Sequence, residues 1–240
     1  MVLYMGENYS ALIKEYIGNT NVNIKTASYS HCPKSWHFED LCPDFNKFYL
    51  ICDGRGWLEI KGKKYYLERG YFFWLPASTE QSYKTDKHFR LKKYWCHFNA
   101  SVNQFELTDF INFPVLLKIK EMDCIINLFS ELVKNYQEDN YSSQLSARAI
   151  LMQIIIYYIN NTSDNKIIIK DSPGIKNINR VLDYIEKNIS KNISIEELAD
   201  ITHYHPNYFI ELFKNHLGKS PIQYINELKI TKAKEMIGTT

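Results

Sequence analysis

The stretch SIEELADITHYHPNYFIELFKNHLGKSPIQYINELKITKAKEMIG, residues 194–238, decides the C-terminal part of the fold. Ser194 followed by Glu197 is a capping box, which predicts that a helix begins there. Pro206 suits the first turn of a second helix, and Gly218 is a natural residue at its end. Apolar residues recur at helical spacing in both segments. We therefore expect two helices joined by a tight turn.

A third helix is expected to begin after Ser220 and Pro221. Its apolar residues also recur at helical spacing: Ile222, Ile225, Leu228, Ile230, Ala233 and Ile237. Two short helices joined so tightly form the arrangement that presents the second helix to the major groove of DNA. A helical bundle without a DNA role is the alternative, because short amphipathic helices are common.

Residues 194–237 resemble the first DNA-binding subdomain of the AraC/XylS transcription regulators. The matching segments are SIEELADIT, HPNYFIELFKNHLG, SPIQYI and KITKAKEMI. The resemblance implies a helix-turn-helix unit with a recognition helix at about residues 206–217, followed by a linker helix. Members of that family carry a second such unit, whereas this sequence ends at Thr240. We therefore expect one unit in this chain.

The recognition helix is expected to pack Phe209, Leu212 and Phe213 inward and to turn its other side toward DNA. Asn207 suits a paired hydrogen bond to adenine, and Glu211 can accept one from cytosine N4. An aliphatic side chain can contact a thymine methyl group, and lysines anchor phosphates. Each of these residues is alternatively an ordinary solvated side chain. The predicted DNA-binding residues are Asn207, Tyr208, Ile210, Glu211, Lys214 and Lys219.

Composition predicts a globular protein but does not indicate its partner. The 240 residues are 45% hydrophobic and 23% charged, which is typical of a folded chain with room for two domains. The net charge is only +2, so the DNA prediction depends on the motif rather than on charge. The five cysteines form no CxxC pair, which favours free thiols over zinc or disulfides. With no signal-peptide pattern and no long apolar run, we expect a cytoplasmic protein without a membrane partner.

Short aromatic and β-branched runs separated by turn residues fill residues 22–118, which predicts a small antiparallel barrel. Gly54-Arg55-Gly56 predicts a tight hairpin, Gly62 lies between two further runs, and Pro76 follows another strand. GRGWLEIKGKKYYLERGYFFWLPASTEQSY followed by KKYWCHF resembles the cupin-type sensor barrel of many AraC-family regulators. The expected fold class is α+β, with a ligand-sensing barrel in residues 1–120.

Two amphipathic helices are expected at residues 121–137 and 143–160, lying antiparallel because their connection is short. The resemblance implies that this pair, residues 121–162, covers the barrel and forms a homodimer interface. Alternatively, the helices only cover the barrel. Residues 163–175 are predicted to be a linker in which Pro173 and Gly174 break regular structure, and residues 176–240 the DNA-binding subdomain.

The resemblance also implies a small-molecule pocket in the barrel. Carried over by position, its residues are Tyr83, Lys93 and Trp95, with Trp36 and His37 at the mouth. An indole stacks on a sugar or another ring, and an ammonium pairs with an anionic group, so the effector is expected to be sugar-like or anionic. The alternative is that these aromatic residues only fill the barrel.

An enzymatic barrel is the less favoured interpretation. Catalytic cupins hold a metal with a His-x-His pair, a Glu and a later His, and no such pair lies in residues 22–118. His203 and His205 have this spacing but belong to the predicted turn between the DNA helices. We therefore expect no metal, no cofactor and no catalytic activity. The predicted function is a ligand-responsive DNA-binding regulator; a dimerising sensor that modulates a full-length partner is the main alternative.

Overall fold

The computed structural model describes residues 7–163 and 166–238, and it confirms the α+β fold class. The chain forms two compact units. One unit contains Val22–Ala100 and Asn112–Ile168; the other contains Met1–Asn21, Ser101–Ile111 and Ile169–Thr240. Residues 7–21 and 101–111, which lie in the range predicted for the barrel, thus group with the C-terminal helices. The functional boundaries drawn from sequence stay a prediction.

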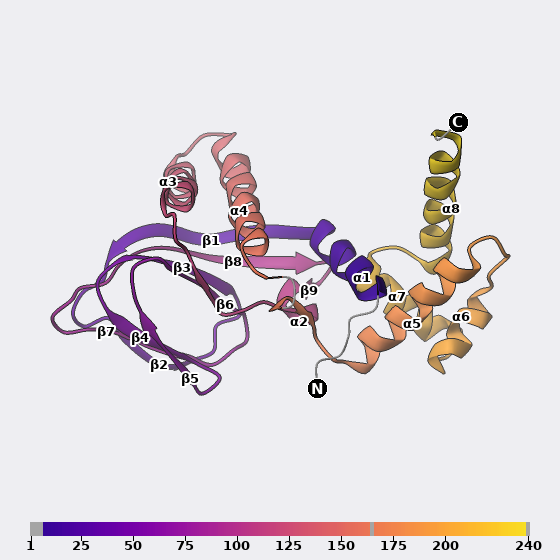
Figure 1. Cartoon of the computed structure of the whole chain (residues 1–240), viewed down its shortest axis with the longest axis horizontal. Helices are drawn as coiled ribbons and strands as arrows, with labels where there is room; N and C mark the ends of the chain where they lie inside the picture. Colours follow the sequence, from indigo (N-terminus) through magenta and orange to yellow (C-terminus); the bar gives the residue numbers. More distant parts are fainter. Residues whose placement is uncertain (1–6, 164–165, 239–240) are drawn as a thin grey trace. The chain divides into compact units, whose positions relative to one another are not determined.

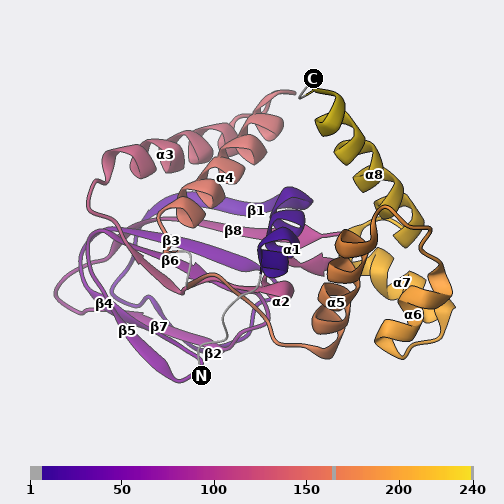
Figure 2. The ribbon, with the colours of Figure 1, turned by 45° about the vertical axis from the view of Figure 1, so that its right-hand side comes forward.

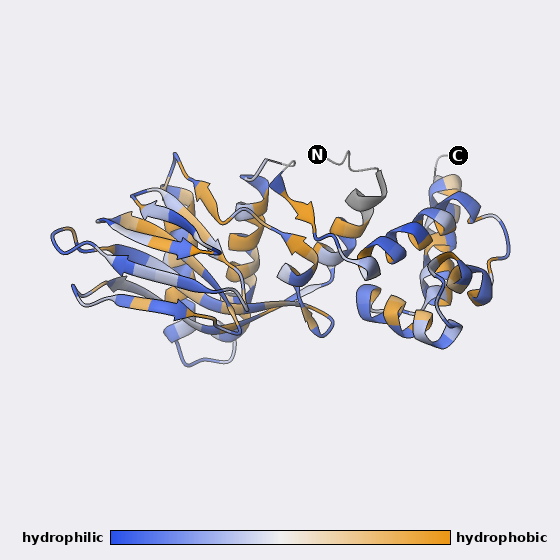
Figure 3. Cartoon of the chain, turned by 90° about the horizontal axis from the view of Figure 1, so that it is seen from below, coloured by the Kyte–Doolittle hydropathy of each residue, from blue (hydrophilic) through white to orange (hydrophobic). Residues whose placement is uncertain are grey.

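Two antiparallel sheets build the first unit (Figure 1). The larger sheet has the strand order β1 (Thr20–His31), β8 (Lys92–Val102), β3 (Asn46–Asp53), β6 (Tyr71–Leu75) and β11 (Leu116–Lys118). The smaller sheet has the order β2 (His37–Leu41), β7 (Gln81–Thr85), β4 (Gly56–Ile60) and β5 (Lys63–Leu67). Hydrophobic and hydrophilic residues both occur along the strands, as Figure 3 shows. Buried and half-buried residues alternate along β7 of the smaller sheet, which gives it one buried face toward the interior, whereas β3 and β6 of the larger sheet are buried on both faces.

The interior between these sheets is apolar and aromatic. Its buried cluster draws on both sheets: Cys32, Tyr49, Ile51, Leu58, Ile60, Leu67, Phe73, Leu75, Tyr83 and Leu91. Burial of such side chains is the main favourable contribution to folding, at roughly 25 cal/mol per Å² of apolar surface. The predicted small barrel is therefore present.

The predicted hairpin at Gly54–Gly56 is absent. Strand β3 pairs with β6 and β8, whereas β4 pairs with β5 and β7, so this segment carries the chain from one sheet to the other. Gly54 has a φ of +86°, and a Cβ atom placed on it would lie 2.1 Å from the backbone oxygen of Arg90. Position 54 therefore requires glycine because the backbone of Arg90 approaches it closely, and not because of a two-residue turn. The hairpin between β4 and β5 instead turns at Lys61 and Gly62.

The predicted helix pair is confirmed as α3 (Asp123–Gln137) and α4 (Ser143–Asn160). Both helices lie over the large sheet in Figures 1 and 2. Phe72 of β6 contacts Phe129 of α3 and Tyr158 of α4, with ring centroids 5.5 and 4.9 Å apart. Aromatic pairs at such distances add to the apolar burial. The helices therefore cover the face of the sheet that points away from the interior.

The second unit is helical. It contains α1 (Glu7–Gly18), α2 (Leu107–Phe110), α5 (Pro173–Asn188), α6 (Ile195–Thr202), α7 (Pro206–Leu217) and α8 (Pro221–Gly238). Strand β9 (Phe105–Glu106) pairs with the end of β8, and β10 (Ile111–Asn112) pairs with β12 (Ile168–Ile169). Among the described residues, no helix has the length and hydropathy to span a bilayer.

The prediction that Pro173 and Gly174 break regular structure is wrong. Ser172 caps the start of α5, because its Oγ accepts a hydrogen bond from the N–H of Ile175 at 3.2 Å. Proline is tolerated in the first turn of a helix, since its missing N–H has no helical partner there. The same two residues that suggested a linker therefore begin a helix.

We expect Gly54→Ala to destabilise the protein by about 2 kcal/mol or more, because the new methyl group meets backbone that cannot move aside. Gly62→Ala is the matched control: Gly62 also has positive φ, at +72°, but a Cβ there meets nothing within 4 Å. Its cost should be about 1 kcal/mol, from the left-handed conformation alone. Urea unfolding measures both variants. Equal losses would contradict the close approach at Gly54.

Candidate functional site

Two lysines lie inside the barrel. Lys47 of β3 and Lys93 of β8 are only 2% and 3% exposed. In the register of these strands Lys47 lies opposite His97 and Ile51 opposite Lys93. Because alternate residues share a face and opposite residues point the same way, this register places both ammonium groups on the interior side.

Aromatic rings surround the ammonium groups. The Nζ of Lys93 lies 3.2 Å from the ring centroid of Tyr49 and 4.5 Å from that of Trp36. The Nζ of Lys47 lies 5.1 Å from the ring centroid of Tyr83. The electron-rich ring faces attract these cations and replace part of their lost hydration.

Neither lysine has an acidic partner among residues 7–163 and 166–238, since no ion pair there joins Lys47 or Lys93 to a carboxylate. Burial, with a smaller contribution from the nearby charge of Lys47, lowers the pKa of Lys93 to about 7. Burial also lowers the pKa of Lys47 to about 8. The interior thus holds two lysines whose protonated forms persist only at substantial energetic cost, because buried charges are normally paired.

Two more polar side chains belong to this interior. The amide oxygen and nitrogen of Gln81, on β7, are both buried without a hydrogen-bond partner in the described part of the chain. Buried polar groups are nearly always satisfied, so such a group calls for an explanation. His97 faces the same way as Lys93, and burial together with the lysine charges lowers its pKa to about 3. His97 is therefore neutral at physiological pH.

Four of the five predicted pocket residues lie together. Trp36 stacks on Tyr83 with ring centroids 4.5 Å apart, and the ammonium of Lys93 lies between Trp36 and Trp95, 5.9 Å from the latter ring. His37 instead contacts Glu39 at 2.8 Å on the exposed side of β2.

Lys47, Tyr49 and Gln81 were absent from the predicted pocket. A signal existed for the first: Lys47 is the one charged residue within the apolar run FNKFYLIC. A lysine inside a strand buried on both faces requires a special environment. For Gln81 the signal is its place two residues before Tyr83, because alternate residues of a strand share a face.

A cleft of about 950 Å³ lies elsewhere on this unit. Its lining comes from three segments: residues 53–57, 66–69 and 84–87. Acidic and basic side chains both line it, and Asp53 forms an ion pair of 2.8 Å with Lys92. Solvated charges of both signs favour no ligand class, so the barrel interior is the stronger candidate for a binding site.

The helix-turn-helix geometry follows the predicted caps. The Oγ of Ser194 accepts a hydrogen bond from the N–H of Glu197 at 3.1 Å, which begins α6. His203 adopts a left-handed conformation at the turn, with φ of 57° and ψ of 32°. Helix α7 begins at Pro206 and ends before Gly218, whose φ is +74°. The predicted starts and ends of both helices are therefore confirmed.

The two sides of α7 differ as expected. Phe209 and Phe213 are fully buried, and their ring centroids lie 5.7 Å apart. Leu212, also predicted to face inward, is only half-buried. The predicted DNA-binding residues occupy the remaining surface: Asn207, Tyr208, Glu211 and Lys214 are exposed, and Ile210 is half-buried.

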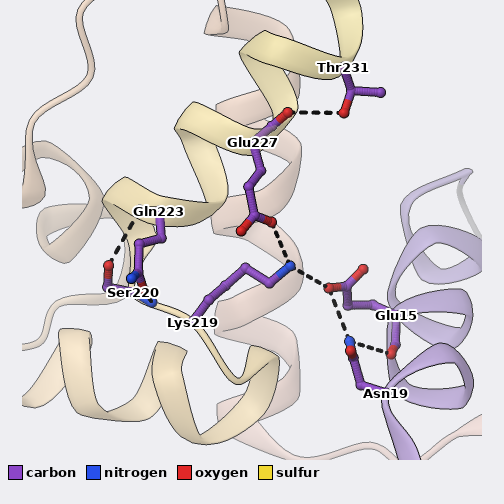
Figure 4. A network of polar contacts seen from close by, with 7 residues as sticks. All are labelled: Glu15, Asn19, Lys219, Ser220, Gln223, Glu227 and Thr231. Carbon is purple, nitrogen blue, oxygen red and sulfur yellow. Dashed lines mark hydrogen bonds and ion pairs between the residues drawn. The ribbon is translucent and has the colours of Figure 1, made fainter.

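Lys219 differs from the other predicted DNA contacts. Its Nζ lies 2.8 Å from Glu227 of α8 and 3.4 Å from Glu15 of α1 (Figure 4). The hydrogen bond to Glu227 is the largest cause that raises the pKa of Lys219. Two carboxylates therefore already neutralise the ammonium group of Lys219, which was predicted to contact a DNA phosphate.

The C-terminal end of α7 is held by other segments of its own unit. The hydroxyl of Tyr16, on α1, lies 2.8 Å from Nδ1 of His216. Asn103 donates from its side-chain amide to the backbone oxygen of Asn215 at 2.9 Å. These contacts leave the N-terminal half of α7 as its accessible end. Recognition helices of this kind contact bases with their N-terminal residues.

No metal centre is formed by the described residues: within 7–163 and 166–238, no group of three His, Cys, Asp or Glu side chains converges.

Comparisons with known proteins identify both units. Residues 24–155 match the AraC-like ligand binding domain, and residues 185–226 match the bacterial regulatory helix-turn-helix proteins of the AraC family. The chain belongs to the AraC family. The matched ranges include Lys47, Lys93 and Gln81 in the first case and all of α6 and α7 in the second.

Relatives of this AraC-family chain include transcription activators. The lactose operon transcription activator of Staphylococcus xylosus is 23% identical over 193 residues, which cover 79% of this chain and 68% of that protein. The XylDLEGF operon transcriptional activator of Pseudomonas putida is 28% identical over 123 residues, or 50% of this chain and 37% of that protein. Among solved structures, ToxT from Vibrio cholerae is 14% identical, with a TM-score of 0.36 and coverage of 86% of this chain and 98% of that one.

We expect Lys93→Met to stabilise the protein by on the order of 2 kcal/mol at pH 7, because it removes a buried, unpaired ammonium and keeps the aliphatic volume. Lys84→Met, on β7 and half-exposed, is the control. Wild-type stability should also rise from pH 7 to pH 9. The unfolded lysines keep their protons to about pH 10.5, whereas folded Lys93 and Lys47 release theirs near 7 and 8, so the unfolded chain binds more protons in that window.

Urea unfolding at the two pH values measures both effects. The buried thiols oppose part of this rise, because burial raises the pKa of Cys32 and Cys96 in the folded state, whereas unfolded thiols begin to ionise at about pH 8.5. Tyr49 and Tyr83 do not contribute below pH 9, because burial raises the pKa of each, and His97 is already neutral. The rise should therefore be smaller in Lys93→Met than in the wild type. A loss of stability in Lys93→Met, or an equal pH dependence of the two proteins, would show that the ammonium is not a destabilising group.

Proposed function

We propose that this protein is a DNA-binding transcription regulator whose activity responds to a small molecule held in the barrel. The observation that carries the proposal is the exposed N-terminal half of α7 on an AraC-family helix-turn-helix unit. The unsatisfied polar groups inside the AraC-like ligand-binding domain support the second part. The relatives named above are activators, and we propose no catalytic role and a cytoplasmic location.

In this proposal α7 enters the major groove. Asn207 reads a base near the start of the helix, Glu211 reads one a turn later, and Tyr208 and Ile210 add apolar contacts. Lys214 is exposed and makes no ion pair within the described residues, so it is free to neutralise a phosphate. Lys219 contributes less, since Glu15 and Glu227 already neutralise it.

Asn207→Ala should change which sequences are bound, because a bidentate amide contact contributes about 1–3 kcal/mol of discrimination between bases. Lys214→Ala should instead weaken binding to all sequences and reduce the salt slope by about 1. Fluorescence anisotropy at two salt concentrations, with duplexes selected from a random pool, measures both. Lys134→Ala, an exposed residue of α3, is the control. If both α7 variants lost affinity equally on every duplex, the proposed orientation of the helix would be wrong.

We further propose that the protein is a homodimer through α4. This helix leaves an apolar seam exposed or half-exposed at spacings of four, three and four residues: Leu145, Ala149, Met152 and Ile156. Such spacing is typical of a coiled-coil interface. Leu145 and Ile156 are 68% and 51% exposed, which is unusual for large aliphatic residues on a covering helix. Two copies bound together would raise the effective concentration of the second DNA-binding unit.

Ile156→Asp should convert a dimer into a monomer and lower DNA affinity by about tenfold or more through lost avidity. Gln144→Asp, on the same helix outside the seam, is the matched control. Analytical ultracentrifugation gives the oligomeric state, and anisotropy gives the affinity. Leu132 is fully buried, so its replacement would test folding rather than assembly. A wild-type monomer with the same affinity as Ile156→Asp would exclude this interface.

A further inference from the structure

We infer that the ligand of the barrel is an organic anion with an apolar body, whose carboxylate or phosphate group lies between Lys47, Lys93 and Gln81. This inference rests on the proposed function only in that the barrel must bind a ligand. It excludes a neutral sugar as the natural ligand and assigns a role to two residues, Lys47 and Gln81, that the predicted pocket did not include.

The charge of the interior favours an anion. The Nζ of Lys93 lies 3.2 Å from the ring centroid of Tyr49, and the Nζ of Lys47 lies 5.1 Å from that of Tyr83. These two ring centroids are only 6.1 Å apart. Two ammonium groups therefore share one small region, and no carboxylate of the described part of the chain pairs with either. A neutral sugar would leave both cations unpaired, whereas one anion would satisfy both and gain from the low local dielectric.

Gln81 adds a third polar side chain to the site, from the opposite sheet. It lies on β7 of the small sheet, opposite Ile60 of β4, whereas both lysines belong to the large sheet. Its amide has two N–H donors and no partner, so it can donate to an oxygen of the anion. A carboxylate or phosphate would thus be held from both sheets at once.

An apolar body would take the place of Trp36 beside the polar groups. Trp36, from the segment between β1 and β2, is half-buried and stacks on Tyr83 at an interplanar angle of 26°. The same indole lies 4.5 Å from the ammonium of Lys93. Trp36 thus occupies both the stacking surface and the position beside the cation. A ring or chain attached to the anion can displace it and make the same contacts.

The test compares acids with their uncharged partners. Thermal unfolding of the whole chain would be measured with phenylacetate, 3-phenylpropionate, hexanoate and phenyl phosphate against phenylacetamide, 3-phenylpropionamide, hexanamide and phenol. Inorganic phosphate and glucose complete the panel. We expect at least one acid to raise Tm, with an affinity at least tenfold above that of its uncharged partner. Inorganic phosphate should act more weakly because it lacks the apolar body.

The variants locate the site. Lys47→Met and Lys93→Met should each reduce the affinity for the active acid at least tenfold, and Gln81→Leu should reduce it less, whereas Lys84→Met should not change it. Binding should also weaken between pH 7 and 9 as the two lysines lose their protons. The other groups facing them stay uncharged in this window: Cys32, Tyr49, Tyr83 and His97.

Three results would overturn the inference: equal stabilisation by uncharged compounds or glucose, full retention of acid binding in both lysine variants, or no response to any acid. The DNA assay distinguishes these from a failure of the proposed function. If wild-type protein selects a duplex but no acid binds, the regulator stands and the anion site fails. If an acid binds through the lysines but no duplex is selected, the anion site stands and the DNA-reading role fails.

Discussion

The antiparallel register between β3 and β8 is the constraint on which the barrel depends. Asn46 lies opposite Phe98 and Ile51 opposite Lys93; both faces of β3 are buried, and those of β8 are buried or half-buried. A shift of one residue would exchange the two faces of a strand. It would move Lys93 beneath the helices α3 and α4 and place Phe98 or Cys96 in the interior. The apolar covering of one face therefore fixes the polar site on the other.

That site is a case in which stability and function are opposed. Two buried ammonium groups and an unsatisfied amide weaken a core that apolar residues of similar size would strengthen. The aromatic rings of Tyr49 and Trp36 compensate the lysines only in part, because ring faces are weaker partners than a carboxylate. Natural proteins keep such groups where activity requires them.

The helical unit uses its polar contacts differently. Here they are satisfied, and they hold one end of α7. Tyr16, Asn103 and the ion pairs of Lys219 all fix the C-terminal end of this helix or the residues directly after it. The helix is thereby positioned by residues from distant parts of the chain, while Asn207 and Glu211 stay exposed. Local caps define the helix, and long-range contacts decide which of its ends is accessible.

The sequence by itself determined the features that depend on near neighbours: the cap at Ser194, the limits of α7, the strand alternation and the amphipathic pair α3 and α4. Its two errors have different causes. Gly54 suggested a hairpin because the sequence does not show that the backbone of Arg90 approaches it. Pro173 suggested a break although the local signal for a helix start, a capping serine directly before a proline, was present at Ser172. Only the tertiary structure decided that Lys47 joins Lys93 without an acid and that Lys219 is already paired. The charge around a side chain depends on residues far along the chain, which short-range patterns do not encode.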